Sequence, residues 1–295
     1  MPRARVSAVS RGRRKTLSMI AMGSAALALG HLRRARAAQP LRLGLTAVFL
    51  DDQVAFLRQW RNYLEAKLGR RVEFVQRGRY RETMELLRGG NLDAAWICGF
   101  PYVRYRQDLT LVAVPVFEGK PLYRSYLIVP SSDAATRSIL DLRGRMFAYS
   151  DPDSNSGFLY PTYQLYKAGQ RSEAFFARTF FTWAHRMVVE AVAASLAHGG
   201  AVDGYVWETL RLASPELTAR TRVADKSPEF GHPPIAARAS LPAEEARALQ
   251  AVLTGMAADP EGRALLGRLN LDGFTPGSDD LFSSIDRMRL EVFQG

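Results

Sequence analysis

Two patterns of apolar and polar residues alternate along the chain, one with the period of a strand and one with the period of a helix. Apolar and polar side chains alternate in LRLGLT (41–46) and again in RVEFVQ (71–76), which predicts two strands. Between these segments, apolar residues recur every three or four positions and predict a helix that ends at Gly69. Strands that alternate with helices of this length are typical of α/β proteins.

The same alternation continues to the C-terminal part of the chain. Further strands are predicted at DAAWIC (93–98), LVAVPV (111–116), SYLIVP (125–130), RMFAYS (145–150), TFFTW (179–183) and AVDGYVW (201–207). Helices are predicted around 84–87, over SSDAATRSILDL (131–142), at 188–196 behind His185, at 246–256, and from Pro260 with Asp259 as its N-cap. The length of 295 residues suits one large α/β domain or two lobes of moderate size.

The formal net charge of +11 would suggest a nucleic acid or a membrane surface as partner, but the location of the charge changes this interpretation. Nine cationic residues and no acidic residue lie before Ala37. Without that segment the net charge falls from +11 to +2. The rest of the chain is therefore not strongly basic, and we expect no nucleic-acid partner.

Residues 1–38 have the order of features of an export signal. A basic region ending in GRRKTL precedes the apolar stretch 17–30, and the small residues of ARAA close the segment. We expect cleavage after Ala37 or Ala38 and a periplasmic location. The arginine pair at 13–14 resembles a twin-arginine signal, whereas the general secretory route, an uncleaved anchor helix and a disordered tail are alternatives.

Cys98 is the single cysteine, so no disulfide can form within the chain. The signal ends without a cysteine, which predicts that the protein is not a lipoprotein. Cys98 lies in the apolar run AAWICGF, and we expect it to be a buried structural thiol. Zinc binding or thiol catalysis would need partner residues that the sequence does not offer, so we expect no cofactor.

The stretch SDPDSNSGFLYP places small hydrogen-bonding residues directly before an apolar, helix-like run. Proline inside a helix clashes with the carbonyl four residues earlier, so Pro161 predicts a helix that begins close to Gly157. The first amides of a helix lack intrahelical partners and attract anions. Ser154, Asn155 and Ser156 add side-chain donors, and Gly157 would let a ligand approach the backbone. The pattern suits a tetrahedral oxyanion, with a plain serine-capped turn as the alternative.

The same stretch resembles a motif of a known family, the periplasmic phosphonate-binding proteins of ABC transporters and their phosphite- and phosphate-binding relatives. The family shows Asp-Pro-x-Ser-Thr/x-Ser-Gly-Phe-Leu-x-Pro, and this chain has DPDSNSGFLYP. Further matches are RYRETMELLRGGNLDAAW, GFPYV, LYRSYLIV and AHRMVVEAV. The resemblance covers essentially all of the chain after the signal.

This resemblance implies a two-lobed periplasmic binding protein of type II, the Venus-flytrap form. Each lobe would be a mainly parallel sheet flanked by helices, and the ligand would lie between the lobes. The expected boundaries are 39–128 for the first part of lobe 1, 129–230 for lobe 2, and 231–295 for the return to lobe 1 and the C-terminal helices.

The resemblance also implies which residues bind the ligand. Ser154, Asn155 and Ser156 would hold the phosphonyl oxygens, with Gly157 beside them. Asparagine at 155 replaces the hydroxyl residue common in the family, and its amide can still donate. The opposing side chains are expected to be Tyr80 and Tyr123 from the first lobe and His185 from the second.

The far end of the expected pocket departs from the family pattern. Relatives that recognise aminoalkyl phosphonates hold the ammonium group with carboxylates, whereas the corresponding positions here are Tyr205, after Asp203, and Pro233 in GHPPI. An ammonium group without a carboxylate would be poorly paired in a closed cleft. We therefore expect a simpler oxyanion such as phosphate, phosphite or a small alkylphosphonate, with Tyr205 and Asp203 as possible further contacts.

Three functions fit these features. The first, which we favour, is a monomeric solute-binding protein that captures a phosphorus oxyanion and delivers it to the membrane permease of an ABC transporter. The second is a ligand-sensing module for a membrane signalling partner. The third is a hydrolase, because Ser154 or Ser156, His185 and Asp203 are the residue types of a catalytic triad. The serines lack a GxSxG nucleophile elbow, so we expect no enzyme.

Overall fold

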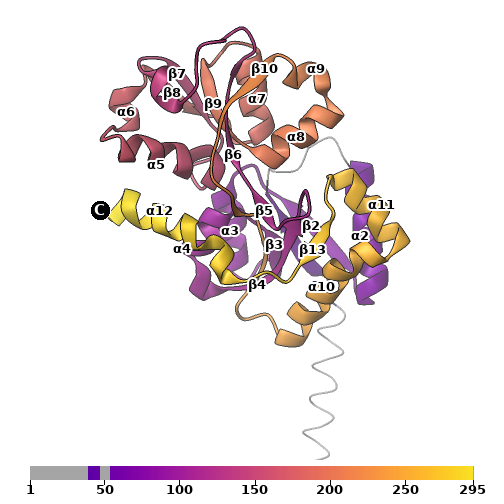
Figure 1. The fold of residues 1–295 in the computed structure, drawn as a ribbon. Coiled ribbons are helices and arrows are strands. Elements are labelled where there is room, and N and C mark those ends of the chain that lie inside the picture. Colours follow the sequence, from indigo (N-terminus) through magenta and orange to yellow (C-terminus); the bar gives the residue numbers. More distant parts are fainter. Residues whose placement is uncertain (1–38, 47–53, 295) are drawn as a thin grey trace, which may run out of the picture. The chain divides into compact units, whose positions relative to one another are not determined.

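The computed structural model describes residues 39–46 and 54–294, and the predicted export signal lies outside these ranges. Two main sheets carry the fold of the described chain from residue 41 onward (Figure 1). We refer to each sheet with its flanking helices as the first and the second lobe.

The first sheet has six strands in the order β13-β4-β12-β3-β1-β2. These strands are β1 (Leu41–Leu45), β2 (Val72–Gln76), β3 (Ala94–Trp96), β4 (Leu109–Val116), β12 (Ile235–Arg238) and β13 (Gly273–Thr275). β1 pairs in parallel with β2 and β3, whereas β12 and β13 run antiparallel to their neighbours. Segments more than a hundred residues apart therefore complete one sheet.

The second sheet has five strands in the order β10-β6-β9-β7-β8. These strands are β6 (Ser125–Pro130), β7 (Met146–Tyr149), β8 (Arg178–Phe181), β9 (Gly199–Asp203) and β10 (Thr221–Lys226). β7 pairs in parallel with β8 and β9, and β6 pairs antiparallel with β9 and β10. The α/β class is confirmed, but both sheets are mixed rather than mainly parallel. A parallel neighbour within one sheet needs a crossover connection, usually a helix. β6 and β12 reach their sheet from the other lobe, so they can pair antiparallel with their neighbours.

A two-stranded ribbon lies where the chain passes from one sheet to the other. β5 (Leu122–Tyr123) leads from β4 to β6, and β11 (Phe230–Gly231) leads from β10 back to β12. The two strands pair antiparallel, with Phe230 opposite Tyr123. The ribbon fixes Tyr123 beside the residues that follow β11.

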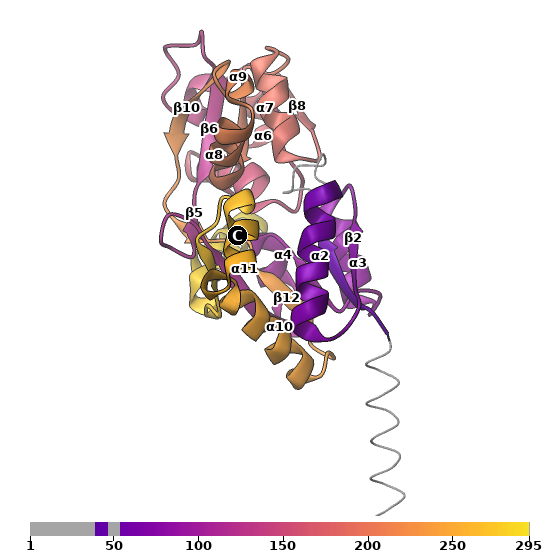
Figure 2. The same ribbon diagram turned by 90° about the vertical axis from the view of Figure 1, so that its right-hand side faces the viewer.

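In the described residues, α-helices flank the strands of both lobes. The helices of the first lobe are α2 (Val54–Leu68), α3 (Tyr80–Arg88), α4 (Gly99–Arg104), α10 (Ala243–Gly255), α11 (Pro260–Leu269) and α12 (Ser283–Gln294). Those of the second lobe are α5 (Tyr160–Lys167), α6 (Ser172–Phe175), α7 (His185–Ala193), α8 (Gly204–Ala213) and α9 (Pro215–Thr218). α2 packs against α10 and α11, as Figure 2 shows, and α12 packs against both α4 and α5.

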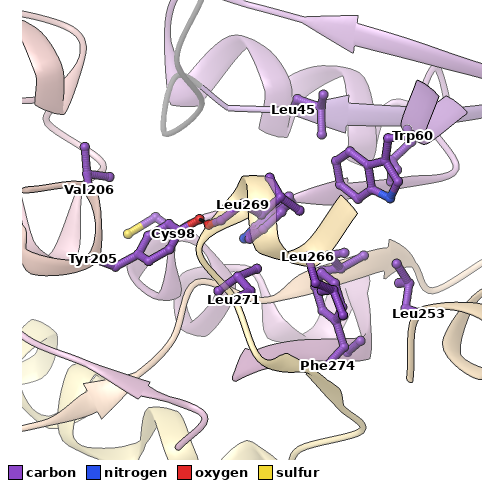
Figure 3. Close-up of a cluster of buried hydrophobic side chains, with 14 of the residues drawn as sticks. Leu45, Trp60, Cys98, Tyr205, Val206, Leu253, Leu266, Leu269, Leu271 and Phe274 are labelled. Atoms are coloured by element: carbon purple, nitrogen blue, oxygen red, sulfur yellow. Dashed lines mark hydrogen bonds between the residues drawn. The ribbon is translucent and has the colours of Figure 1, made fainter. Parts of the chain in front are cut away.

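Large aromatic rings fill the core of the first lobe. Trp60 on α2 meets Trp96 at the end of β3 edge to face, with 6.0 Å between ring centroids, and Trp96 meets Phe274 of β13 at 5.7 Å. Trp60 and Phe274 appear in Figure 3 with Leu266 of α11. Burial of side chains of this size contributes about 1.5–3 kcal/mol each. The apolar face predicted for the first helix therefore packs as expected.

The helix predicted at 131–142 does not form. One 3₁₀ turn, η2 (Ile139–Leu142), is the helical part of this segment. The Asp133 carboxylate accepts hydrogen bonds from the amides of Ala135 and Thr136 at 2.9 and 3.0 Å. An aspartate that bonds nearby backbone groups competes with helix formation, so a turn replaces the first part of the predicted helix.

The strand predicted at 201–207 ends early. β9 stops at Asp203, and α8 begins at Gly204 because the Asp203 carboxylate accepts from the amides of Tyr205 at 2.8 Å and Val206 at 3.4 Å. Trp207 therefore lies on a helix and not at a strand end. The helix predicted at 188–196 also ends early, at Ala193 of α7.

Among the residues that the structure describes, no helix combines the length and the apolar composition that a membrane span requires.

Candidate functional site

The polar segment predicted as a site starts with a π-helical turn, η3 (Asn155–Leu159), that leads into α5. Ser154 is its N-cap, and Leu159 N donates to Ser154 O at 2.9 Å, five residues back. The helical run thus begins two residues before Gly157, the predicted start. π-Helical turns of this kind are frequent at functional sites.

Pro161 has no N–H group, so it donates no hydrogen bond to the carbonyl groups of the turn before it. The Gly157 carbonyl accepts from Ser150 N at 3.3 Å, and the Ser156 carbonyl accepts from Ser125 Oγ at 2.7 Å. Ser125 begins β6 and Ser150 follows β7. Two strands of the second sheet therefore hold the turn in place.

Gly157 has a different role from the one expected. A Cβ atom there would lie 1.8 Å from Ser150 Oγ and 3.1 Å from His185 Cε1. The expectation that the missing side chain leaves room for a ligand is therefore wrong, because protein atoms fill that space. The Gly157 amide donates to Ser154 Oγ at 3.0 Å, so it is not a free donor either. Gly157 lets the turn pack against β7 and α7.

His185 lies behind the turn and is a neutral donor. Asp203 N donates to His185 Nδ1 at 3.0 Å, and burial lowers the pKa of His185 to about 3. The ring proton therefore sits on Nε2, which faces Ser154 Oγ across a long contact of 3.5 Å. Ser154 Oγ accepts from the Gly157 amide, which leaves the Ser154 hydroxyl proton available to a ligand.

Asn155 links the turn to the two-stranded ribbon. Its Nδ2 donates to the Tyr123 hydroxyl oxygen at 2.9 Å, so the Tyr123 proton is also available to a ligand. Burial raises the pKa of Tyr123 well above its ordinary value, and the hydroxyl stays protonated. The backbone N–H of Asn155 donates to Cys98 Sγ at 3.2 Å. Cys98 is buried as predicted, and burial raises its pKa to about 12.

Ser156 and Tyr80 carry buried hydroxyls without a hydrogen-bond partner among the described residues. Both residues are 1% exposed. Burial raises the pKa of Tyr123, and the nearby Ser156 side chain acts in the opposite direction. Buried hydroxyls are usually paired, so these two are candidates for contacts with a ligand.

Asp151 brings Tyr80 to the turn from the other lobe. Its carboxylate accepts from Tyr80 N, the first amide of α3, at 3.1 Å and from Asp153 N at 2.8 Å. Burial raises the pKa of Tyr80 well above its ordinary value, and the electrostatic influence of Cys98 and Asp151 acts in the same direction. Asp151 therefore caps the N-terminus of α3, whereas the side chain of Arg79, the residue directly before α3, makes no capping bond.

Asp203 lies at the site, but its carboxylate does not contact His185. Its carboxylate caps α8, and its backbone N–H, not its carboxylate, meets the imidazole. Burial raises the pKa of Asp203 to about 7. In a catalytic triad the carboxylate accepts from Nδ1–H and Nε2 accepts the serine proton, and His185 has the opposite proton arrangement. Ser154, His185 and Asp203 are thus near one another without the geometry of a triad.

Tyr205 is buried close to the site, but its hydroxyl is engaged elsewhere. The hydroxyl donates to the carbonyl of Leu269 at the end of α11, and the ring lies 5.4 Å from that of Phe117. Figure 3 shows Tyr205 and Leu269 within the cluster of buried apolar side chains. Tyr205 therefore joins α8 to the first lobe and leaves little hydrogen-bonding capacity for a ligand.

Four neighbouring residues were not predicted to take part. Ser125 and Ser150 support the turn through its carbonyls, Asp151 positions Tyr80, and His232 lies with its ring 5.6 Å from that of Tyr123. His232 stands in the GHPPI segment, next to the proline singled out from the sequence. A polar residue in an otherwise apolar, proline-rich run was the signal that could have identified it.

Taken together, the site consists of neutral hydroxyl donors in a buried turn between two sheet-containing lobes. Such an architecture is that of a two-lobed binding protein of type II. Known structures agree. The binding protein of an ABC phosphonate transporter from Pseudomonas aeruginosa superposes with a TM-score of 0.78 at 23% identity, covering 86% of this chain and 87% of the other. PhnD1 from Prochlorococcus marinus, in complex with methylphosphonate, gives 0.76 at 18% identity, covering 84% and 96%.

The chain belongs to the family described as "ABC transporter, phosphonate, periplasmic substrate-binding protein", whose model matches residues 44–282. The family and the type II fold predicted from the sequence are thus confirmed.

Curated relatives carry different ligand names. The phosphate-import protein PhnD of Mycolicibacterium smegmatis is 32% identical over 158 residues, which are 50% of this chain and 48% of that protein. The chain thus spans about half the length of this relative. The phosphonates-binding periplasmic protein of Escherichia coli is 26% identical over 251 residues, covering 82% of this chain and 74% of that protein.

Proposed function

We propose that this chain is the periplasmic solute-binding component of an ABC importer and that it captures a phosphorus oxyanion at the turn 154–157. The observation that carries the proposal is a group of buried hydroxyls that still have hydrogen-bonding capacity. Two hydroxyls, Ser156 and Tyr80, have no partner among the described residues, and two more have oxygens that already accept a bond. Hydroxyl donors in a buried site suit an oxyanion that offers several acceptor oxygens.

The names of the relatives support the class of ligand. One relative is named for phosphate and another for phosphonates, and a structural neighbour holds methylphosphonate. All three ligands share three oxygens on a tetrahedral phosphorus. We propose that Ser154, Asn155, Ser156, Tyr80 and Tyr123 bind these oxygens, with His185 behind Ser154.

The proposal extends to the organisation of the protein. Lobe 1 would be 39–128 together with 231–295, and lobe 2 would be 129–230. Residues 1–38 would direct export and be removed without lipid attachment. The protein would act as a monomer, without catalysis, and deliver its ligand to a membrane permease. Contacts such as Tyr80 N to Asp151 join segments of both lobes, so a ligand that also contacts both would favour the closed state.

Calorimetric titration of the purified protein tests this function. The ligands are phosphate, phosphite, methylphosphonate, 2-aminoethylphosphonate and sulfate. We expect at least one of the first three to bind more tightly than the aminoalkyl compound, because Tyr205 and Pro233 replace carboxylates. No binding of any phosphorus compound would contradict the proposed function. Tightest binding of 2-aminoethylphosphonate would contradict the proposed ligand class.

A further inference from the structure

His232 is a fully buried histidine whose ring makes no hydrogen bond within the described chain. Its exposed fraction is 0%, and both Nδ1 and Nε2 lack a partner. Burial lowers the pKa of His232 to about 3, so the ring is neutral, with one donor and one acceptor nitrogen. The Pro233 carbonyl, which also accepts from Trp96 Nε1 at 2.9 Å, offsets this shift in part. A phenylalanine would fill the same space without unpaired polar atoms.

The backbone around His232 is fixed on both sides. His232 N donates to the Pro121 carbonyl at 3.0 Å, which continues the ladder of the two-stranded ribbon. Two residues later, the Pro234 carbonyl accepts from Ile97 N at 2.9 Å. The imidazole is therefore held at a defined place and does not lie in a loose loop.

The ring of His232 lies among the aromatic side chains of the site. It is 5.6 Å from the ring of Tyr123 and 5.0 Å from the ring of Tyr205, measured between centroids. The Tyr123 oxygen accepts from Asn155, and the Tyr205 hydroxyl donates to Leu269. The hydroxyls of Tyr123 and Tyr205 thus take part in hydrogen bonds, whereas the ring nitrogens of His232 have no partner among the described residues.

We infer that His232 hydrogen-bonds the fourth substituent of the bound phosphorus oxyanion and so favours phosphate over phosphite and methylphosphonate. The inference rests on the proposed function. The three ligands share three oxygens, for which Ser154, Ser156, Tyr80 and Tyr123 supply hydroxyls. They differ in the fourth substituent, which is oxygen, hydrogen or methyl. A neutral imidazole can donate to a bare oxygen or accept from a P–OH group, whereas hydrogen and methyl leave it unpaired.

The test compares two ligands on matched variants of the whole protein. Phosphate and methylphosphonate are titrated calorimetrically into wild type, His232→Phe, His232→Gln and the remote control His198→Phe. We expect His232→Phe to weaken phosphate binding roughly ten- to hundredfold, the effect of losing one hydrogen bond to a charged group, and to change methylphosphonate binding much less. His232→Gln should restore part of the phosphate affinity, and His198→Phe should change neither ligand. Equal losses for both ligands, or unchanged phosphate affinity, would overturn the inference.

A second measurement needs no variant and stands if His232→Phe does not fold. In wild type labelled with ¹⁵N-histidine, phosphate should shift the imidazole nitrogen resonances of His232 strongly, and methylphosphonate should shift them less. Nitrogen resonances that respond equally to both ligands would overturn the inference. A wild type that binds neither compound contradicts the proposed function itself, which is a different result from binding without discrimination.

Discussion

The two ends of the candidate site differ in what their polar groups offer. At the turn 154–157, the Ser154 hydroxyl oxygen accepts from the Gly157 amide and the Ser156 hydroxyl has no partner among the described residues, so both hydroxyls can still donate. At the other end the Tyr205 hydroxyl donates to the Leu269 carbonyl, and both ring nitrogens of His232 lack a partner among the described residues. The first arrangement can bind any oxyanion of the right size. The second, through His232, distinguishes the fourth substituent of the phosphorus oxyanion. Affinity therefore depends on the hydroxyls of the turn, and selectivity depends on His232.

The largest expected effect concerns the packing that holds the turn. Gly157→Ala places a methyl group 1.8 Å from Ser150 Oγ, so the turn must move. We expect the free energy of unfolding to fall by about 1–3 kcal/mol and anion binding to be lost. Thermal unfolding and calorimetry measure the two effects.

The matched control for that change is Gly267→Ala in α11, where an added Cβ meets no atom within 4 Å. This variant should keep wild-type binding and gain up to about 1 kcal/mol in stability. A Gly157→Ala protein that unfolds and binds like wild type would show that the turn tolerates displacement.

Single serine variants separate ligand binding from support of the turn. Ser154→Ala and Ser156→Ala should each weaken phosphate binding by about 1.5–3 kcal/mol. Ser154→Ala should also lower the free energy of unfolding by about 1 kcal/mol, because Ser154 Oγ caps the Gly157 amide. Ser156→Ala should not, since its hydroxyl has no partner in the described chain. Equal stability losses in chemical denaturation would contradict this distinction.

Two tyrosines at opposite ends of the site provide the next comparison. Tyr80→Phe removes an unpaired buried hydroxyl, so it should weaken anion binding and leave stability unchanged or higher. Tyr205→Phe removes the bond to Leu269, so it should lower the free energy of unfolding by about 1 kcal/mol and spare binding. The reverse pattern in calorimetry and thermal unfolding would exchange the roles assigned to these residues.

The smallest expected effect is a change in the pH dependence of stability. The pKa values of His185 and His232 are lowered to about 3, so unfolding takes up protons below about pH 6.5 and stability falls as the pH decreases toward 3. Asp203 acts in the opposite direction. Its pKa is raised to about 7, so the folded state binds more protons between about pH 4 and 7.

Asp203→Asn should therefore steepen the fall of Tm between pH 6.5 and 4.5 by a few degrees. The amide oxygen of asparagine can still cap α8. Tm measured on ligand-free wild type and variant over this range checks the sign. A shallower fall in the variant would show that Asp203 is ionised throughout this range in the folded protein.

The sequence was informative where the residues that form a feature lie close together along the chain. Ser154, Asn155 and Ser156 are consecutive and Pro161 follows five residues later, so the start of their turn could be predicted to within two residues. The strand-helix order of the first lobe was equally local. The helix predicted at 131–142 and the strand predicted at 201–207 were wrong because the side chains of Asp133 and Asp203 accept hydrogen bonds from nearby amides. The apolar periodicity of a sequence does not reveal such bonds.

Contacts between distant segments could not be derived from the sequence. Asp151 meets Tyr80 across 71 residues, and His232 lies against Tyr123 because β11 pairs with β5. Ser150 fills the space beside Gly157, which the sequence left open for a ligand. The resemblance to a family supplied Tyr80, Tyr123 and His185 as a group, and the structure shows which of their atoms make hydrogen bonds.

The most direct test of the central claim is calorimetric titration of phosphate into the double variant Ser154→Ala/Ser156→Ala. A double variant of two exposed serines, Ser131→Ala/Ser132→Ala, serves as control. We predict that the first protein, folded by circular dichroism, binds phosphate at least about a hundredfold more weakly than wild type, and that the control binds like wild type. Wild-type affinity in the first protein would contradict the assignment of the turn as the anion site.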